Sequence, residues 1–561
     1  MKKKLLLIVT LALVAVLLSG CALFQWLIVA PRMSPVTKRE IAPAPDVVYE
    51  EDGYVDMDMM EAEYAVAGMV APMMSANASM KSLTFDGPQF NTEEYASTAE
   101  NGFKNVQTSP LSTFSADVDT ASYCNLRRML NDGYSLQEIP AGAVRVEEML
   151  NYFRYNYDAP KDGAKFGVTA QIADCPWNKV SKLLLLGVRA ADAPEKTSEG
   201  SNLVFLIDVS GSMGEPNKLG LVKKALTLLT EQLTEQDTLS ICTYSDGEKI
   251  VIEGANPVKD RAKLITAIDG LQAMGYTDGQ KGLAQAYDVA LRHYRPHGNN
   301  RVIMCSDGDL NVGITSESDL HDFVSEKKQT GVYLSVLGFG AGNYKDTKME
   351  TLADDGNGNY YYIDSILEAR KVLVEDLTQT LYAVADDVKF QIEFNPAKVS
   401  AWRQVGYENR ALADEDFEND AKDAGEVGAG AQVTVLYELI PAKGEFAESG
   451  LKYQTGALTD AAHSDEWLTL SIRYKAPGGE ESKLETVTAG DADLTNAPSD
   501  DFRFASAVAE FGMILGKSDY IGKADYADVL NLLKTTQLSD DYREELFSLV
   551  KIAQRTEQLG Q

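Results

Sequence analysis

The stretch LVFLIDVSGSM, residues 203–213, decides the fold of this chain. Its five leading apolar residues predict a buried β-strand, and the polar D-x-S-x-S run begins where that strand ends. Asp208, Ser210 and Ser212 therefore bring one carboxylate and two hydroxyls into a single tight loop. All three side chains offer oxygen, which hard cations such as Mg²⁺ prefer as a ligand. The stretch predicts a strand followed by a metal-binding loop.

Strand-like and helix-like segments alternate from residue 203 to about residue 380. Such alternation predicts an α/β fold with a doubly wound, mostly parallel sheet covered on both faces. Right-handed crossovers then place the carboxyl ends of the parallel strands along one edge. The predicted strands are residues 203–207, 239–244, 301–305 and 332–337, and the predicted helices are residues 218–232, 280–294 and 320–329.

Two later loops belong at the same sheet edge as Asp208. Asp307 directly follows the predicted strand 301–305. In a doubly wound order, its strand and the strand of Asp208 are neighbours where the strand order reverses, and ligands bind at that point. Between them in sequence, the loop GYTDG at residues 275–279 precedes a helix, and Thr277 stands where a helix cap would.

Together, the D-x-S-x-S run and these two loops resemble the metal-ion-dependent adhesion site of von Willebrand factor type A domains. Tyr276 departs from the small residue that the family usually has before the Thr. The resemblance implies a site for Mg²⁺, or for Mn²⁺ or Ca²⁺, that consists of Asp208, Ser210, Ser212, Thr277 and Asp307.

The resemblance also implies how such a site binds. In the family, the hydroxyls contact the metal directly and the aspartates often act through water. Mg²⁺ keeps several waters in its octahedral shell, so an outside carboxylate can replace one of them. We therefore expect a protein partner that supplies an Asp or a Glu.

The regions on either side of the type A domain resemble those of a family of bacterial envelope lipoproteins. Too few strands precede residue 203 to form a stable sheet unaided. We therefore expect a flanking region at residues 109–195 to contact a second region at residues 383–561, with the type A domain inserted between them at residues 196–382. The resembling segments are STFSADVDTASYCNLRRML (112–130), AVRVEEMLNYFRYNY (143–157), VGYENRALADEDFENDAKDAGEVGAGAQVTVLYEL (405–439) and DFRFASAVAEFGMILGKS (501–518).

The flanking regions have their own secondary-structure patterns. In the second region, alternation predicts antiparallel strands with solvent on one face, followed by C-terminal helices. In the first region, one strand and two helices precede two further strands. The predicted strands are residues 112–120, 166–172, 182–188, 388–394, 432–440 and 467–474, and the predicted helices are residues 121–131, 144–153, 502–515, 526–533 and 541–554.

The N-terminus has the pattern of an export signal. Three lysines precede an apolar run at residues 5–18, and LSGC at residues 18–21 resembles the bacterial lipobox, in which the Cys carries lipid. The alternative is an uncleaved membrane anchor, because residues 22–30 are also rather apolar. We expect a signal peptide at residues 1–21, lipidation of Cys21 and a flexible acidic tether at residues 22–108. The protein would then be exported and anchored to the cell membrane or the outer membrane.

Composition and cysteine placement limit the function. Against 84 acidic residues the chain has 52 Lys and Arg, a net charge of −32, which argues against nucleic-acid binding. Cys242 and Cys305 lie in strand-like runs and are interpreted as buried free thiols. Cys124 and Cys175 could pair, but their spacing does not require it.

The leading prediction is a binding protein rather than an enzyme. The Gly-Ser-Met-Gly run around Ser212 is not a G-x-S-x-G nucleophile elbow, and the four histidines do not fall in the strand-end loops. Two alternatives remain: a metal-dependent hydrolase, and a scaffold whose metal site is filled internally by a carboxylate such as Glu426 in the acidic stretch 414–426.

Overall fold

The computed structural model describes residues 95, 99–193, 200–275, 279–308, 317–340, 346–442 and 458–560. The predicted signal peptide, Cys21 and nearly all of the predicted tether lie outside these residues. Within them, no helix combines the length and the apolar character that a membrane crossing needs.

A six-stranded sheet with β5 (Ser201–Asp208) near its centre forms the domain expected to be of type A. From β5 the chain runs outward to the antiparallel edge strand β7, and then returns to β8 on the other side of β5. The strand order therefore reverses between β5 and β8, and the doubly wound, mostly parallel sheet is confirmed. The sheet order is β10 (Tyr360–Ile363), β9 (Tyr333–Phe339), β8 (Asn299–Ser306), β5, β6 (Thr238–Tyr244) and β7 (Glu248–Ala255).

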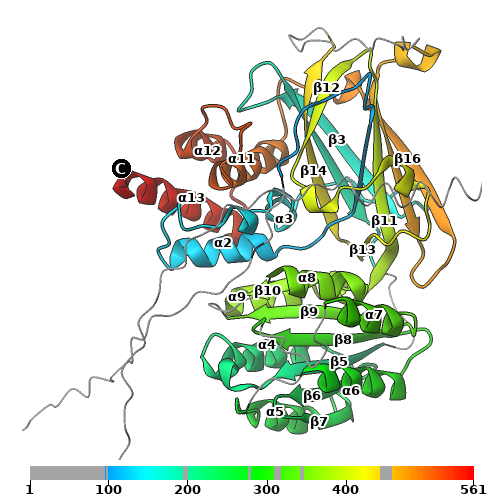
Figure 1. The fold of residues 1–561 in the computed structure, drawn as a ribbon, viewed down its shortest axis with the longest axis vertical. Helices are drawn as coiled ribbons and strands as arrows, with labels where there is room; N and C mark the ends of the chain where they lie inside the picture. Colours follow the sequence, from blue (N-terminus) through cyan, green and yellow to red (C-terminus); the bar gives the residue numbers. More distant parts are fainter. Residues whose placement is uncertain are drawn as a thin grey trace, which may run out of the picture. The chain divides into compact units, whose positions relative to one another are not determined.

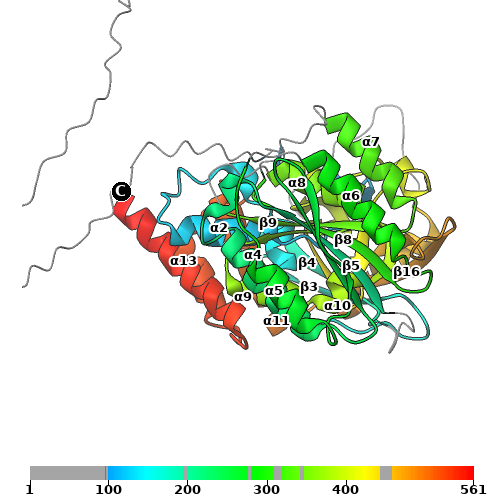
Figure 2. The same cartoon turned by 90° about the horizontal axis from the view of Figure 1, so that it is seen from below.

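Helices cover both faces of this sheet because its strands are apolar on both sides. Leu203, Phe205 and Ile207 of β5 pack toward α4, α5 and α9, whereas Val204 and Leu206 pack toward α6, α7 and α8. Figure 2 shows the two helical layers on either side of the strands. The helices are α4 (Leu219–Gln232), α5 (Arg261–Asp269), α6 (Gly279–Arg292), α7 (Glu317–Lys328), α8 (Asp346–Asp355), α9 (Ile366–Arg370) and α10 (Leu377–Leu381).

The two flanking regions build a β-sandwich together. β4 of the first region pairs antiparallel with β14 of the second, and β2 pairs with β11. The expected contact between the flanks is therefore confirmed (Figure 1). One sheet has the order β1 (Lys104–Asn105), β12 (Val399–Val405), β14 (Gln432–Pro441), β4 (Lys182–Ala190) and β3 (Phe166–Asp174). The other has the order β13 (Gly425–Gly428), β11 (Ala383–Phe394), β15 (Glu466–Lys475) and β16 (Ser482–Gly490), with β2 (Leu111–Ser115) beside β11.

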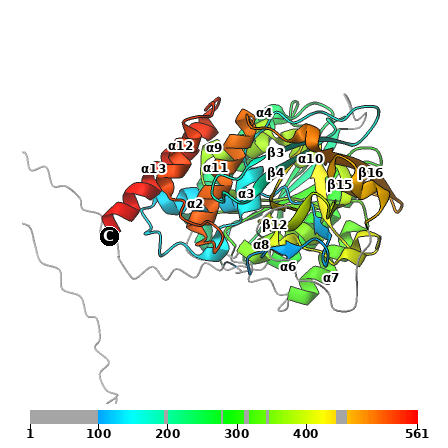
Figure 3. The ribbon, with the colours of Figure 1, turned by 90° about the horizontal axis from the view of Figure 1, so that it is seen from above.

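A layer of helices covers the outer face of the first sheet. Leu436 of β14 packs among these helices, whereas Tyr437 faces the second sheet. The prediction of solvent on one face is therefore wrong for β14, because a third layer buries that face as well. Figure 3 shows the helices along one side of the strands. The layer consists of α2 (Ala121–Asn131), α3 (Val146–Asn151), α11 (Asp500–Leu515), α12 (Tyr526–Leu533) and α13 (Asp541–Gly560).

The four described cysteines are buried and free. Cys242 and Cys305 lie in β6 and β8, so the interpretation of these two as buried thiols is confirmed. Cys124 and Cys175 do not pair either.

Candidate metal centre

The D-x-S-x-S loop gathers its three oxygen-bearing side chains as predicted. Asp208 is the last residue of β5 and is fully buried. The backbone N–H of Ser210 donates to Asp208 Oδ1 at 2.8 Å, which turns the chain back over the end of the strand. A short turn at residues 211–214 follows, and the hydroxyl oxygens of Ser210 and Ser212 lie 3.0 Å apart. Ser212 is half-buried, so this side of the loop faces outward.

Asp307 lies beside this loop because β8 is the neighbour of β5. Ile207 pairs with Cys305, so the residues that follow the two strands share one edge of the sheet. The Ser306 hydroxyl donates to Asp208 Oδ2 at 3.4 Å, and Asp307 is 1% exposed. Sequence analysis missed Ser306. Its place as the last residue of β8, beside the end of β5, could have identified it.

The loop that carries Thr277 approaches the D-x-S-x-S loop. Thr277 itself lies outside the described residues. The Met274 N–H donates to the Val209 carbonyl at 2.7 Å, and the Gly275 carbonyl accepts from the Gly211 N–H at 3.0 Å. Gly275 has φ +83°, and a Cβ there would stand 2.4 Å from a carboxylate oxygen of Asp246. Only glycine fits this close approach.

The electrostatics of the site favour a bound cation. Burial raises the pKa of Asp208 to about 6, and the negative charge of Asp307 acts in the same direction, while hydrogen bonds from Ser210 partly oppose them. Two buried carboxylates side by side are costly unless a positive charge compensates them. With the two serine hydroxyls, the donor set is all oxygen and fits a hard divalent cation.

A lysine already supplies part of this positive charge. Lys218 directly precedes α4, and its Nζ lies 3.0 Å from Asp307 Oδ2, with the two side chains only 5% and 0% exposed. Gly340 makes room for it, because a Cβ there would stand 2.4 Å from the Lys218 Cε. Sequence analysis missed this residue, since a lysine before an amphipathic helix is normally solvated.

Glu426 does not reach the predicted metal site. Its carboxylate lies near Asp387, Asp423 and Lys328. The adjacent Asp386 accepts from the hydroxyl of Tyr333, which opens β9 beside the start of β8. Asp307 follows the other end of β8, and a strand of this length spans about 20 Å or more. Internal filling of the metal site by Glu426 is therefore not what the structure shows.

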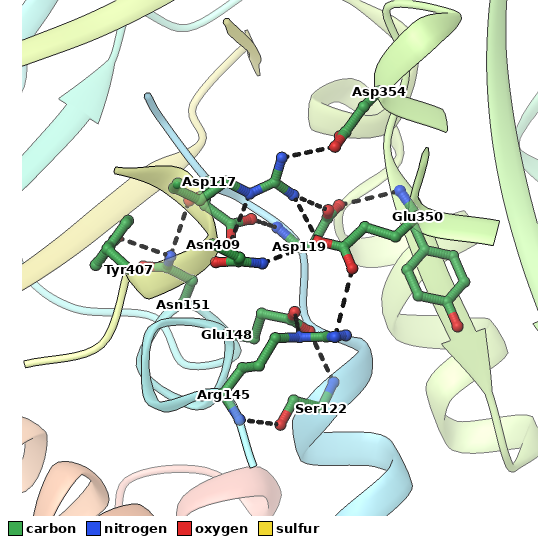
Figure 4. Close-up of polar contacts among 12 residues, drawn as sticks. Asp117, Asp119, Ser122, Arg145, Glu148, Asn151, Glu350, Asp354, Tyr407 and Asn409 are labelled. Carbon is green, nitrogen blue, oxygen red and sulfur yellow. Dashed lines mark hydrogen bonds and ion pairs between the residues drawn. The ribbon is translucent and has the colours of Figure 1, made fainter. Parts of the chain in front are cut away.

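A second polar centre joins the type A domain to both flanks (Figure 4). The Arg410 guanidinium lies 3.3 Å from Asp117, 3.0 Å from Asp119, 3.1 Å from Glu350 and 2.7 Å from Asp354. These acids come from the segment after β2 and from α8. Arg410 and Asp119 are 291 positions apart in the sequence, so sequence patterns do not reveal the cluster. Arg410 pairs with all four acids and Arg145 pairs with Glu350, so these ion pairs cross the seam between the type A domain and the flanks and form a structural junction.

Family models match most of the described chain. The model for the von Willebrand factor type A domain matches residues 202–377, and one described as von Willebrand factor matches residues 89–185. A third, described as the C-terminal region of the uncharacterized protein YfbK, matches residues 379–556.

Relatives match this chain over different lengths. The uncharacterized protein YfbK of Escherichia coli strain K12 is 39% identical over 502 residues, which cover 88% of this chain and 86% of that protein. Human inter-alpha-trypsin inhibitor heavy chain H3 is 27% identical over 172 residues, 29% of this chain and 19% of that protein. A solved von Willebrand factor type A structure from Catenulispora acidiphila is 15% identical, covers 71% of this chain and 91% of that chain, and has a TM-score of 0.38. The chain belongs to the bacterial von Willebrand factor type A family that includes YfbK of Escherichia coli.

Proposed function

We propose that this chain is an envelope lipoprotein that binds a protein partner through a divalent cation. The observation that carries the proposal is the pair of buried carboxylates, Asp208 and Asp307, beside the hydroxyls of Ser210 and Ser212 at the carboxyl edge of the parallel sheet. Its family supports this reading, because type A domains are metal-dependent adhesion and interaction modules.

The residues of the site have different roles in binding. Asp208, Ser210, Ser212 and Asp307, with Thr277 from the adjoining loop, would hold Mg²⁺, Mn²⁺ or Ca²⁺. The bound cation supplies a coordination position that accepts an oxygen ligand. The half-buried Ser212 and the exposed Gly211 leave this side of the loop open to a partner's Asp or Glu side chain. Lys218 then keeps Asp307 oriented and partly neutralised before the cation arrives.

The N-terminal sequence supports a location in the cell envelope. Cys21 in the lipobox-like LSGC would carry the lipid, and residues 22–108 would connect it to the folded part. A chain so tethered meets partners at the membrane surface, where weak binding sites gain from a high local concentration.

The contacts of two histidines support binding over hydrolysis. His293 pairs with Glu253 in β7, and His321 pairs with Asp355 at the end of α8. Both contacts lie toward the amino ends of the parallel strands, since β7 runs antiparallel to β6 and α8 leads into β10. Neither imidazole can act as a general base for Ser210 or Ser212.

Calorimetric titration of the full-length chain in detergent with Mg²⁺ tests the metal site. We expect saturable binding that Asp208→Ala removes, while Asp269→Ala, an exposed acid at the end of α5, leaves it unchanged. Circular dichroism checks that both variants are folded. Equal binding by Asp208→Ala and the unaltered chain would refute the site.

Capture from envelope extract tests the partner. Immobilised full-length chain should retain a protein in Mg²⁺, and lose it in a chelator or when Asp208→Ala is used as bait. Retention that survives both treatments contradicts recognition through the cation. Cys21→Ser tests the anchor separately: the chain should move from the membrane fraction to the soluble fraction, and unchanged membrane association would argue against lipidation.

A further inference from the structure

We propose a second divalent-cation site, suited to Ca²⁺, formed by Asp387, Asp423 and Glu426 at the seam between the type A domain and the β-sandwich. It lies at the amino edge of the parallel sheet, whereas Asp208 lies at the carboxyl edge. It therefore stands apart from the adhesion site and from the function proposed for it.

The backbone brings the three carboxylates together. Asp387 and Glu426 lie on the paired strands β11 and β13, one residue from the matched pair of Val388 and Gly425. Asp423 precedes β13, and the Ala424 N–H donates to Asp387 Oδ1 at 3.1 Å, which holds that segment in place.

The spacing of the oxygens fits a calcium ion. One oxygen from each of the three carboxylates lies within 4.8 Å of the other two. Ca²⁺ holds its ligands at 2.3–2.6 Å, so two oxygens on one ion can stand up to about 5 Å apart. Every separation in the cluster is at or below 4.8 Å, so one Ca²⁺ can contact all three carboxylates. Three carboxylate ligands also suit Ca²⁺, because Mg²⁺ is usually bound through one or two carboxylates and keeps several waters.

An unpaired buried oxygen points independently to a ligand. Glu426 is 8% exposed, and its Oε1 has no hydrogen-bond partner in the described part of the chain. The neighbouring Asp386 is 5% exposed, and its Oδ1 also has none among the described residues. A buried carboxylate oxygen without a partner carries a desolvation cost that a bound cation removes.

The protein's own lysines form ion pairs with two of the three carboxylates. Lys475 lies 2.6 Å from Asp387, and Lys328 lies 2.7 Å from Asp423. Each lysine pairs with the Oδ2 atom of its aspartate, so the Oδ1 atoms are not engaged by these cations. Glu426 has no such ion-pair partner among the described residues.

Arg301 supplies the third positive charge near the cluster. Its Nη1 is engaged with the Ser335 hydroxyl at 2.5 Å, and its guanidinium lies over the ring of Tyr333. Lys389 also acts electrostatically on Asp387, so the nearby cations match Asp386 and the three carboxylates of the site in number, but none of them forms an ion pair with Glu426 in the described part of the chain. Burial and the charges of Asp386 and Asp423 raise the pKa of Glu426 well above its usual range. A bound divalent ion would offset the cost of burying the Glu426 carboxylate and its repulsion by the neighbouring acids.

The location gives the site a mechanical role. Tyr333 opens β9 and donates to Asp386 of β11 at 2.9 Å, while Lys328 closes α7. In Figure 1, β11 and β13 stand directly over the type A domain on this side. A cation held between β11 and β13 would stiffen the surface on which the type A domain rests.

Terbium luminescence tests the proposal, because Tb³⁺ replaces Ca²⁺ and is excited through a nearby tyrosine. The full-length chain with Asp208→Ala isolates this site from the adhesion site. We expect saturable Tb³⁺ emission that Ca²⁺ competes away, and about tenfold or greater weakening by Glu426→Gln. The matched control Glu415→Gln, on an exposed acid of the same acidic stretch, should bind like its parent.

Two further measurements distinguish loss of ion binding from loss of the luminescence signal. Tyr333→Phe should reduce the sensitised emission while Ca²⁺ affinity measured by calorimetry persists. Ca²⁺ should raise the melting temperature of the Asp208→Ala chain and leave that of Asp208→Ala with Glu426→Gln unchanged. Absence of saturable Tb³⁺ binding, or equal binding after Glu426→Gln, overturns the second site and leaves the adhesion site unaffected.

Discussion

Lys218 and Asp307 form a buried ion pair inside the candidate metal centre. Their Nζ and Oδ2 atoms are 3.0 Å apart, and both side chains are almost completely removed from solvent. An ammonium group carries one positive charge, whereas the expected cation carries two. The lysine therefore lowers the free-energy cost of burying the Asp307 carboxylate in the metal-free protein. Its contribution to stability should be smaller once the metal is bound.

Lys218→Met is expected to destabilise the metal-free chain by about 3 kcal/mol, because it leaves Asp307 buried without its partner. Saturating Mg²⁺ should recover most of that loss, since the cation compensates the same carboxylate. Thermal unfolding in chelator and in Mg²⁺ measures both values. The exposed Lys224→Met serves as a control with little effect in either condition. A loss of equal size in both conditions would separate Lys218 from the metal site.

The proximity of the candidate site residues could be predicted where they are close in sequence or where strand order brings them together. Asp208, Ser210 and Ser212 lie within five residues, and Asp307 follows the strand next to theirs. Lys218 could not be predicted, since only the packed structure directs its side chain inward.

Among the elements, the loop that ends at Gly275 links the D-x-S-x-S loop to α6. Its contacts to Val209 and Gly211 are made by backbone atoms, so they depend on conformation rather than on side-chain identity. Gly275 takes the left-handed region and faces Asp246. A side chain there would clash with the carboxylate of Asp246.

Gly275→Ala is expected to weaken Mg²⁺ binding and to lower stability by about 1–3 kcal/mol, from left-handed strain and from the clash with Asp246. Calorimetry and urea unfolding measure the two effects. Gly220→Ala is the matched control: it lies in α4, and its Cβ would meet nothing within 4 Å. Unchanged Mg²⁺ affinity in Gly275→Ala would show that this loop does not shape the site.

Helix α11 carries a buried acid, Glu510, that titrates near neutrality. Burial raises its pKa from 4.5 to about 7, and the charges of Asp528 and Asp525 add to the shift. As the pH rises from about 4.5 to about 7, the unfolded chain ionises this group while the folded chain still holds the proton. Folding stability from this group therefore falls across that range and stays low above it.

Glu510→Gln should accordingly stabilise the chain by up to about 3 kcal/mol at pH 8, with the gain shrinking toward zero near pH 4. Urea unfolding at several pH values gives the difference curve. Glu480→Gln, an exposed acid, should show no comparable trend. A gain that is independent of pH would exclude the buried carboxylate as its cause.

The apolar pattern predicted the bounds of two helices closely. The bounds of α2 and α12 agree with the predicted residues 121–131 and 526–533. β10 was not predicted because its four residues are too few to show a periodic pattern. β7 was not predicted because it is an edge strand that is largely exposed to solvent. β14 was misjudged because its second face packs on helices that lie far away in sequence.

At the scale of the whole molecule, Arg410 connects three separate segments. It comes from the second flank, pairs with Asp117 and Asp119 after β2, and pairs with Glu350 and Asp354 in the type A domain. Burial raises the pKa of Asp354 to about 6 even beside the guanidinium. Without Arg410, four acids would repel one another at the junction between the domain and the sandwich.

Arg410→Met is expected to cost about 3–5 kcal/mol and to split a single unfolding transition into two, because the junction fails before either core. Scanning calorimetry of the full-length chain measures this. Arg473→Met breaks only the more exposed pair with Asp420, and should cost less than about 1 kcal/mol. One undivided transition at an unchanged temperature would show that the domain and the sandwich are joined mainly by other contacts.

The pairing of β4 with β14 also sets an order of events during synthesis. β4 has the sequence KLLLLGVRA and leaves the ribosome long before β14 has been synthesised. Until then, its apolar side chains remain exposed without their partner strand. The two ends of the inserted domain meet, since the Ser201 and Tyr382 hydroxyls lie 3.3 Å apart. Once that domain has formed, it shortens the effective loop and lowers the entropy of closure. In a nascent chain, we therefore expect residues 182–190 to need a holding chaperone until β14 has been synthesised.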